Sequence, residues 1–211
     1  MRLSRLGFGL KKTLRAAERD RPDVIAKEEA FIKEVSEIPV ENLVFLDEAG
    51  VHLGMTRSHA RAPIGERAMC KRSAAYKSNI SLAGAIQLSG MCELYPYDGP
   101  MDGERFQLFL DRLVPKLKPN SVLIMDNLRV HHMAAVKSKL KDAGIRVLYL
   151  PPYSPERNPI EETWSLIKRA FRTAEADTIS KFIDALQNVK NIVTQHKIEA
   201  FFKHAGYILA E

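Results

Sequence analysis

The chain has 211 residues, of which 45% are hydrophobic and 27% are charged. This length and composition suit one globular domain with room for a small appendage. No apolar run approaches the ~18 residues needed to span a membrane, and the basic N-terminus lacks the apolar core of a secretory signal. We therefore expect no membrane contact and a cytoplasmic location, in which the isolated Cys70 and Cys92 are reduced thiols.

The positive charge is concentrated at the N-terminus. Residues 1–22 contain seven Lys or Arg and two acidic residues, so they carry +5 of the formal net charge of +6. A basic arm on a nearly neutral body favours contact with a polyanion, although a solvated chain end has the same composition. A second basic stretch, from Arg57 to Lys77, has two similar interpretations, a polyanion contact or an ordinary charged hairpin.

The hydrophobic pattern of the N-terminal half predicts one helix and three strands. The helix covers 22–36, and the strands cover 43–47, 79–88 and 91–99. Ser89 and Gly90 separate the last two strands and predict a hairpin turn. Asp102 then starts a second helix that ends near Pro119.

The C-terminal half predicts two further buried strands, over 121–126 and 145–150, with a helix over 130–144 between them. Strands joined by a helix pair in parallel. The chain then ends in helices over about 159–172 and 177–203. A hairpin followed by a parallel pair predicts an α/β fold with a mixed, five-stranded sheet and helices on both faces. This order of elements fits the ribonuclease H-like fold.

Two aspartates occupy matching places in this scheme. Asp47 is the last residue of the buried run LVFLD, and Asp126 is the last residue of VLIMD. Ligands of open sheets bind beyond such strand ends. Either aspartate alone is better explained as a turn or helix cap. Two carboxylates placed together repel each other unless a cation neutralises them, and oxygen ligands favour Mg²⁺ or Mn²⁺.

The stretch LPPYSPERNPIEETW supplies a third acid. Asn158 can cap the following helix and Pro159 fits its first position, which places Glu161 in the first turn. Helical geometry puts Glu161 at the edge of the buried stripe that contains Trp164, about 100° from its centre, whereas Glu162 faces away at about 200°. Glu161 can therefore reach a site at the sheet edge, although a glutamate here also favours the helix dipole or completes a capping box.

The three acidic blocks together resemble a known family. LVFLDEAG, VLIMDN and LPPYSPERNPIEETW are similar, in this order, to the catalytic blocks of DDE transposases of the mariner superfamily, and most of all to the bacterial insertion sequence 630 branch. The 34 residues between Asp126 and Glu161 match the spacing of many members. The resemblance covers roughly residues 40–172. The chain departs from the family pattern at Ala49 and at Glu156-Arg157.

The resemblance implies a catalytic and metal-binding triad of Asp47, Asp126 and Glu161. It also implies two Mg²⁺ or Mn²⁺ ions, about 3.5–4 Å apart, that clamp the attacking and leaving oxygens of an in-line displacement. The implied reactions are hydrolysis at the ends of a mobile element and attack of the freed 3′-hydroxyl on target DNA. The implied partners are double-stranded transposon-end and target DNA, and a second copy of the chain on that DNA.

Candidate DNA contacts are basic residues outside the triad. They are Arg57, Arg61, Lys71, Arg72, His131, Lys168 and Arg169. For His131 a capping role is at least as good an interpretation, and for Lys168 and Arg169 a solvated helix face is an equal alternative. Tyr153 and Trp164 are expected to pack within the protein and not to stack on bases.

The expected domain organisation is a basic arm and helix over 1–38, which resembles the tail of a helix-turn-helix region, and a catalytic domain over 39–211. Two other functions stay open at this point. One is a different ribonuclease H-like nuclease, such as a resolvase, against which the NPIE block argues. The other is a non-catalytic, DNA-binding or regulatory remnant of a transposase, which the short N-terminal segment allows.

Overall fold

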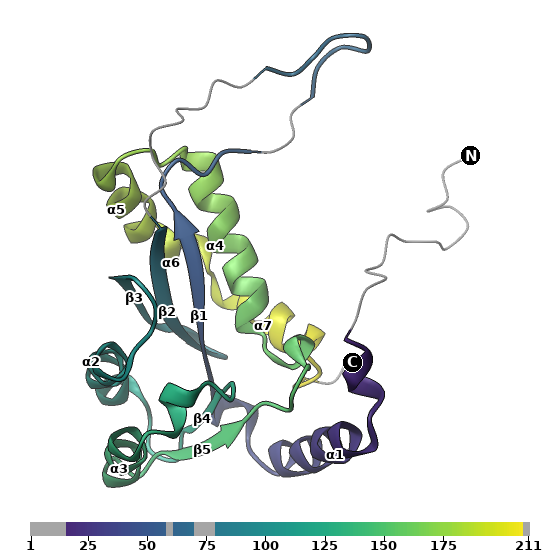
Figure 1. Ribbon diagram of the computed structural model, residues 1–211, viewed down its shortest axis with the longest axis vertical. Coiled ribbons are helices and arrows are strands. Elements are labelled where there is room, and N and C mark those ends of the chain that lie inside the picture. The colour runs from purple at the N-terminus through teal and green to yellow at the C-terminus, as the bar shows by residue number, and fades with distance from the viewer. Residues whose placement is uncertain (1–15, 58–60, 70–78, 209–211) are drawn as a thin grey trace.

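A mixed sheet of five strands forms the centre of the molecule, with strand order β3-β2-β1-β4-β5 (Figure 1). The computed structural model describes residues 16–57, 61–69 and 79–208. The strands are β1 Leu43–His52, β2 Asn79–Gln87, β3 Gly90–Asp98, β4 Val122–Met125 and β5 Arg146–Tyr149. The strands β1, β2 and β3 pair antiparallel, whereas β1, β4 and β5 pair in parallel. The expected α/β fold with a mixed five-stranded sheet is confirmed.

Helices cover both faces of this sheet. In chain order they are α1 Pro22–Ser36, α2 Gly103–Leu113, α3 Ala134–Asp142, α4 Ile160–Ala174, α5 Ile179–Gln187, α6 Val189–Ile192 and α7 Gln195–His204. The helices α2 and α3 pack on one face, whereas α1 and α4 to α7 pack on the other. Within the described residues, no helix combines the length and the apolar character that crossing a bilayer requires.

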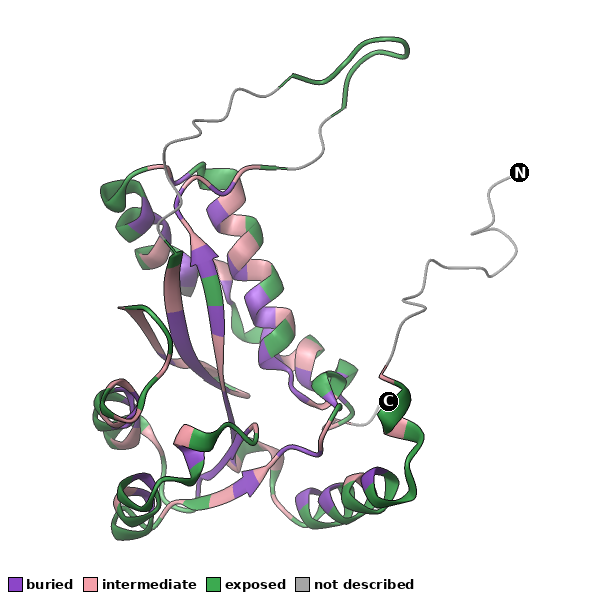
Figure 2. Ribbon diagram, viewed as in Figure 1, coloured by how far each residue is buried: buried purple, intermediate pink, exposed green. Residues whose placement is uncertain are grey.

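Alternation along β1 explains why the sheet has two cores. Side chains of a strand point to opposite faces in turn. Leu43 and Phe45 therefore join the core under α4, whereas Val44 and Leu46 join the core under α2 and α3. Figure 2 shows the consequence, a buried inner side and an exposed outer side on the helices that flank the sheet.

The extent of β1 corrects the expected position of Asp47. The apolar run ends at Asp47, but β1 continues to His52 because β2 pairs with it as far as His52–Asn79. Buried Ala49 and Val51 alternate with more exposed residues in this extension, which is the pattern of a half-buried strand. Asp47 thus lies inside a strand, whereas Asp126 directly follows β4, as expected.

Two helical segments and one helix cap also differ from the expectation. The segment over 130–144 begins as a 3-10 turn, Arg129–His132, and becomes α-helical only at Ala134. The last predicted helix, over 177–203, is divided into α5, α6 and α7. The amide of Asn158 does not cap α4, although the helix starts next to Pro159 as expected. Helix α2, in contrast, is capped by Asp102, whose carboxylate accepts from the Arg105 amide.

Candidate active site

The register of the parallel strands brings the two aspartates to the same level of the sheet. Strand β1 pairs with β4 through Phe45 and Ile124. Asp47 lies two residues after Phe45, and Asp126 lies two residues after Ile124. Asp47 is therefore level with Asp126 although β1 does not end there. The β1–β4 pairing ends just before the two aspartates, at the sheet edge beyond which ligands of open α/β sheets bind.

Helix α4 brings Glu161 and Trp164 to Asp47. The two residues lie three apart, so they share one side of the helix. The indole Nε1–H of Trp164 donates to Oδ2 of Asp47 at 3.1 Å. Trp164 is buried, whereas Glu161 is exposed and makes no side-chain hydrogen bond or ion pair within the described part of the chain. Glu161 is thus free to bind a ligand beside Asp47.

The carboxyl group of Asp47 has a strongly perturbed pKa. Burial raises it from an ordinary value of 3.8 to about 7, and the negative charges of Glu161 and Glu48 contribute to the increase. The hydrogen bonds from Trp164 and from the Glu48 amide act in the opposite direction. Such an accumulation of negative charge at a buried carboxyl is a feature of sites that bind cations or transfer protons.

Asp126 has the opposite electrostatic environment. Burial alone would raise its pKa, but hydrogen bonds from His131 and from the Leu128 amide lower it. Oδ1 of Asp126 lies 3.0 Å from Nδ1 of His131 and 3.1 Å from the Leu128 nitrogen. Asp126 therefore stays ionised at neutral pH while Asp47 is close to its titration point.

His131 lies inside the fold and not on a DNA-facing surface. Its ring is 1% exposed, packs against Phe106 and has Nε2 at 3.3 Å from Oε1 of Glu48. Burial lowers the pKa of His131, but Asp126 and Glu48 outweigh burial and raise it to about 9. The structure does not support the proposed phosphate contact, because both ring nitrogens face acceptors of this chain.

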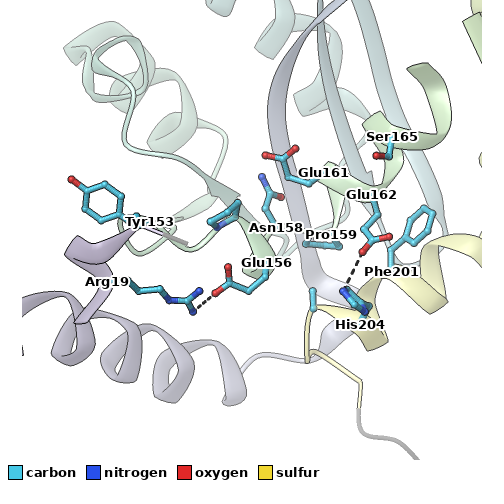
Figure 3. Close-up of a pocket in the computed structure, with 13 residues that line it drawn as sticks. Arg19, Tyr153, Glu156, Asn158, Pro159, Glu161, Glu162, Ser165, Phe201 and His204 are labelled. Atoms are coloured by element: carbon cyan, nitrogen blue, oxygen red, sulfur yellow. Dashed lines mark ion pairs between the residues drawn. The ribbon is translucent and has the colours of Figure 1, made fainter. Parts of the chain in front are cut away.

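A cavity of about 760 Å³ adjoins Glu161 (Figure 3). Its wall contains two ion pairs, Arg19 with Glu156 and Glu162 with His204. The side chain of Glu162 is 42% exposed in the second pair, in agreement with the expectation that it faces away from the buried stripe. Glu162 faces α7, with Oε1 at 3.3 Å from Nε2 of His204, whereas Glu161 faces the site.

The loop before α4 is held by residues from both ends of the described chain. Glu28 of α1 lies 3.1 Å from Arg157 and 3.2 Å from Arg19. The hydroxyl of Tyr207 donates to the Arg157 carbonyl at 2.6 Å. Two of the three positions that depart from the family pattern, 156 and 157, thus pair with the N-terminal segment and not with the triad.

The remaining candidate DNA contacts are scattered. Arg57, Arg61 and Arg169 are exposed and Lys168 is half-buried. Lys71 and Arg72 lie outside the described residues. Tyr153 is 48% exposed on the cavity rim, in contrast to the expectation that it packs inside.

The donor set suits a hard divalent cation. Asp47, Asp126 and Glu161 offer only carboxylate oxygens, which Mg²⁺ and Mn²⁺ prefer. Negative charge raises the pKa of Asp47, and binding of a cation relieves this cost. In the described residues, no three His, Cys, Asp or Glu side chains are close enough together to hold a metal ion as they stand. The acids therefore fit a cation chemically, and binding requires their side chains to converge.

Sequence reasoning missed Glu48 and the two polar contacts that orient the aspartates. The Glu48–His131 contact joins residues 83 apart, and the Trp164–Asp47 bond joins residues 117 apart. No local pattern predicts such pairs. The spacing of Trp164 from Glu161, one helical turn, was the single available signal for its place beside the site.

Comparisons with known proteins give a family and a fold. Residues 42–183, two thirds of the chain, match the family described as DDE superfamily endonuclease. A comparison with curated protein sequences finds no significant match.

Among solved structures, the Mos1 transposase paired-end complex with left transposon end has a TM-score of 0.75 at 16% identity, covering 96% of this chain and 65% of that one. The Mos1 paired end complex with Mn has a TM-score of 0.70 at 16% identity, with the same coverage. The catalytic domain of Mos1 mariner transposase has a TM-score of 0.67 at 15% identity, covering 92% of each chain.

At these identities the similarity establishes the shared ribonuclease H-like fold. This chain spans 65% of the transposase in the paired-end complex and nearly all of the isolated catalytic domain. The family match runs from the start of β1 into the first half of α5 and includes all three acids that the sequence singled out. The chain therefore belongs to the DDE superfamily endonucleases.

Proposed function

We propose that this chain is the catalytic domain of a DNA transposase of the mariner superfamily, in its insertion sequence 630 branch. It cleaves DNA at transposon ends and joins the freed 3′-hydroxyl to target DNA. The observation that carries this proposal is the position of Asp47 level with Asp126 on neighbouring strands, with Glu161 brought beside Asp47 by α4.

Asp47, Asp126 and Glu161 are the proposed metal ligands and catalytic residues. Two Mg²⁺ or Mn²⁺ ions bound there would lower the pKa of the attacking water or 3′-hydroxyl and stabilise the departing 3′-oxygen. Trp164 orients Asp47 by donating to Oδ2. Asp126 has Oδ1 occupied by two donors, and Oδ2 has no hydrogen-bond partner in the described residues, so it is available to a cation.

DNA is the proposed substrate, and a second copy of the chain is the proposed partner on it. The similar structures support DNA and metal, since Mos1 transposase was solved with a left transposon end, with Mn and with Mg. Exposed Arg57, Arg61 and Arg169, together with half-buried Lys168, are the described residues that remain candidates for backbone contacts. Lys71 and Arg72 belong to the same basic stretch in sequence.

The proposed domain division places the basic arm and helix in residues 1–38 and the catalytic domain in 39–211. Helix α1 is not independent of that domain, because Phe31 and Val35 belong to the core under α4. We propose that this helix connects a DNA-reading segment to the catalytic domain.

The test is nicking and strand transfer on a supercoiled plasmid with Mg²⁺, Mn²⁺ or EDTA. Asp126→Asn and Glu161→Gln should abolish metal-dependent activity and leave DNA binding in EDTA unchanged. Glu162→Gln is the matched control, since it removes the neighbouring charge, and it should retain activity. Full activity in Glu161→Gln would overturn the triad.

Mn²⁺ binding, measured by electron paramagnetic resonance, separates the remaining outcomes. If the native chain binds Mn²⁺ but cuts no plasmid, cleavage requires an additional DNA-reading element. A native chain that neither binds Mn²⁺ nor cuts DNA is a non-catalytic remnant, which contradicts the proposed function.

A further inference from the structure

The carboxylate of Asp126 is held at one oxygen only. Oδ1 lies 3.0 Å from Nδ1 of His131 and accepts from the Leu128 amide at 3.1 Å. Oδ2 has no hydrogen-bond partner in the described part of the chain. The Leu128 amide donates to Oδ1 and the His131 imidazole lies against the same oxygen, so the orientation of the carboxylate and of its free oxygen depends on His131 and the following backbone.

His131 is itself held from several sides. Nδ1 also lies 3.0 Å from the Asp126 carbonyl, and the hydroxyl of Tyr149 donates to the His131 carbonyl at 3.3 Å. The ring centroid lies 4.5 Å from that of Phe106. On the far side of the ring, Nε2 lies 3.3 Å from Oε1 of Glu48. The imidazole therefore has one orientation, with a nitrogen facing each carboxylate.

Glu48 has no packing reason to be a carboxylate. Its side chain is 12% exposed and its Oε2 is buried without a hydrogen-bond partner in the described residues. Burying a charged group costs stability unless hydrogen-bond partners compensate for the lost water. A carboxylate with only one of its oxygens bonded is compensated only in part. His131 is its one side-chain partner in the described residues. A residue that reduces stability in this way is explained by a functional contact.

We propose that Glu48 and His131 are positioning residues that set the orientation of Asp126 for metal binding. Glu48 directly follows Asp47 in β1 and points to the opposite face of the sheet. The path Glu48–His131–Asp126 therefore connects the strand that carries one proposed ligand to the segment that carries the other. This inference rests on the proposed function, and neither residue contacts DNA or metal itself.

Two substitutions of His131 separate its two contacts. In His131→Asn, the side-chain amide takes the place of Nδ1 and keeps the bond to Asp126. In His131→Gln, the amide takes the place of Nε2 and keeps the bond to Glu48, while Asp126 loses its donor. We expect His131→Gln to weaken Mn²⁺ binding roughly 10- to 100-fold, the effect typical of residues that orient a ligand. His131→Asn should weaken it clearly less.

Glu48 provides an independent variant. Glu48→Ala frees the outer side of the imidazole, and Glu48→Gln keeps an oxygen that accepts from Nε2. We expect Glu48→Ala to raise the half-saturating Mg²⁺ concentration in the nicking reaction, with a smaller effect on the rate at saturating metal, and Glu48→Gln to restore most of the affinity. The matched control is His196→Asn, because His196 is an exposed histidine of α7, which packs on the opposite face of the sheet from His131.

The measurements are Mn²⁺ affinity by electron paramagnetic resonance, the Mg²⁺ dependence of nicking, and melting temperature in EDTA. Weaker Mn²⁺ binding in the order native, His131→Asn, His131→Gln, at similar melting temperatures, supports the inference. Equal Mn²⁺ affinity in all three proteins overturns it. An equal loss of Mn²⁺ affinity in His131→Asn and His131→Gln, accompanied by lower melting temperatures, overturns it as well. If the native chain and Asp126→Asn bind no Mn²⁺, the proposed function has failed, and this inference fails with it.

Discussion

Trp164 donates its indole N–H to Oδ2 of Asp47 at 3.1 Å, which joins the second turn of α4 to the middle of β1. The ring of Trp164 belongs to the core under α4, and it is 2% exposed. A rigid, buried donor thus determines where one oxygen of the central acid lies. This bond connects the sheet to the helix that carries Glu161. A substitution that removes the indole N–H but keeps an aromatic ring therefore tests the orientation of Asp47 apart from the packing of the helix.

Trp164→Phe removes the donor and keeps an aromatic ring in the core. The hydrogen bond from Trp164 lowers the pKa of Asp47, so its loss should raise that pKa further and demand more metal at a given pH. We expect the half-saturating Mg²⁺ concentration for plasmid nicking to increase about tenfold at pH 7. Unchanged metal dependence, at unchanged melting temperature, would show that Trp164 only packs.

Gly84 makes room for the same ring. A Cβ at position 84 would lie 2.6 Å from Cη2 of Trp164, and Gly84 is the β2 partner of Asp47. Gly84→Ala therefore forces the indole or the strand to move. We expect a loss of about 1–3 kcal/mol in the free energy of unfolding, measured by urea denaturation, together with weaker nicking.

Gly50 provides the control for this substitution. It lies in β1, and a Cβ added there meets no atom within 4 Å. Gly50→Ala should therefore leave both unfolding and nicking close to native. Equal stability of the Gly84→Ala and Gly50→Ala proteins would contradict the crowding argument.

The raised pKa of Asp47 predicts a pH-dependent stability. The folded protein keeps the proton of Asp47 up to about pH 7, whereas the unfolded chain releases it near 3.8. Without metal, this group should therefore make folding less favourable as pH rises from 4 to 7. Asp47→Asn cannot titrate, so it should become more stable than the native protein over this range, by on the order of 1 kcal/mol or more at pH 8.

Metal should reverse this ranking. Mg²⁺ binds the ionised folded form, so it should raise the melting temperature of the native protein most above pH 7 and should not affect Asp47→Asn. The experiment is a series of thermal melts between pH 4.5 and 8, in EDTA and in Mg²⁺. A native protein that stays more stable than Asp47→Asn at pH 8 in EDTA would show that burial does not penalise the charge.

The sequence pattern was sufficient for elements whose signal is local. Four apolar residues before each aspartate predicted buried strands, and the acid three residues after Asn158 was correctly placed in the first turn of α4. The pattern underestimated β1, because its second half is a half-buried strand whose partner, β2, lies after the long basic segment. Pairing with β2 provides backbone hydrogen bonds to the second half of β1, which the apolar run alone does not predict.

Contacts that cross the molecule were not predictable in this way. For His131 the sequence left a phosphate contact and a capping role open, because two adjacent histidines after a strand have no hydrophobic periodicity. Its burial depends on Glu48, 83 residues earlier, and on Phe106 of α2. Likewise, Glu156 and Arg157 were departures without an explanation until the fold placed them beside Arg19 and Glu28.

The pairing of the loop before α4 with the N-terminal segment predicts that Glu28 stabilises the position of Glu161. Glu28 is 17% exposed and faces both Arg157 and Arg19. Glu28→Gln removes the charge that the two guanidinium groups share, whereas the Tyr207 bond and the Arg19–Glu156 pair remain. We expect a loss of about 1 kcal/mol in unfolding free energy, since the network is only partly exposed.

Glu29→Gln is the matched control for this prediction, because Glu29 is the exposed neighbour of Glu28 on α1 and should leave stability unchanged. If the network positions the loop, Glu28→Gln should also lower the nicking rate at saturating Mg²⁺, and high salt should reduce the difference between the two variants by screening the ion pairs. A difference in stability that is independent of salt would instead assign the effect to packing of the Glu28 side chain against the loop.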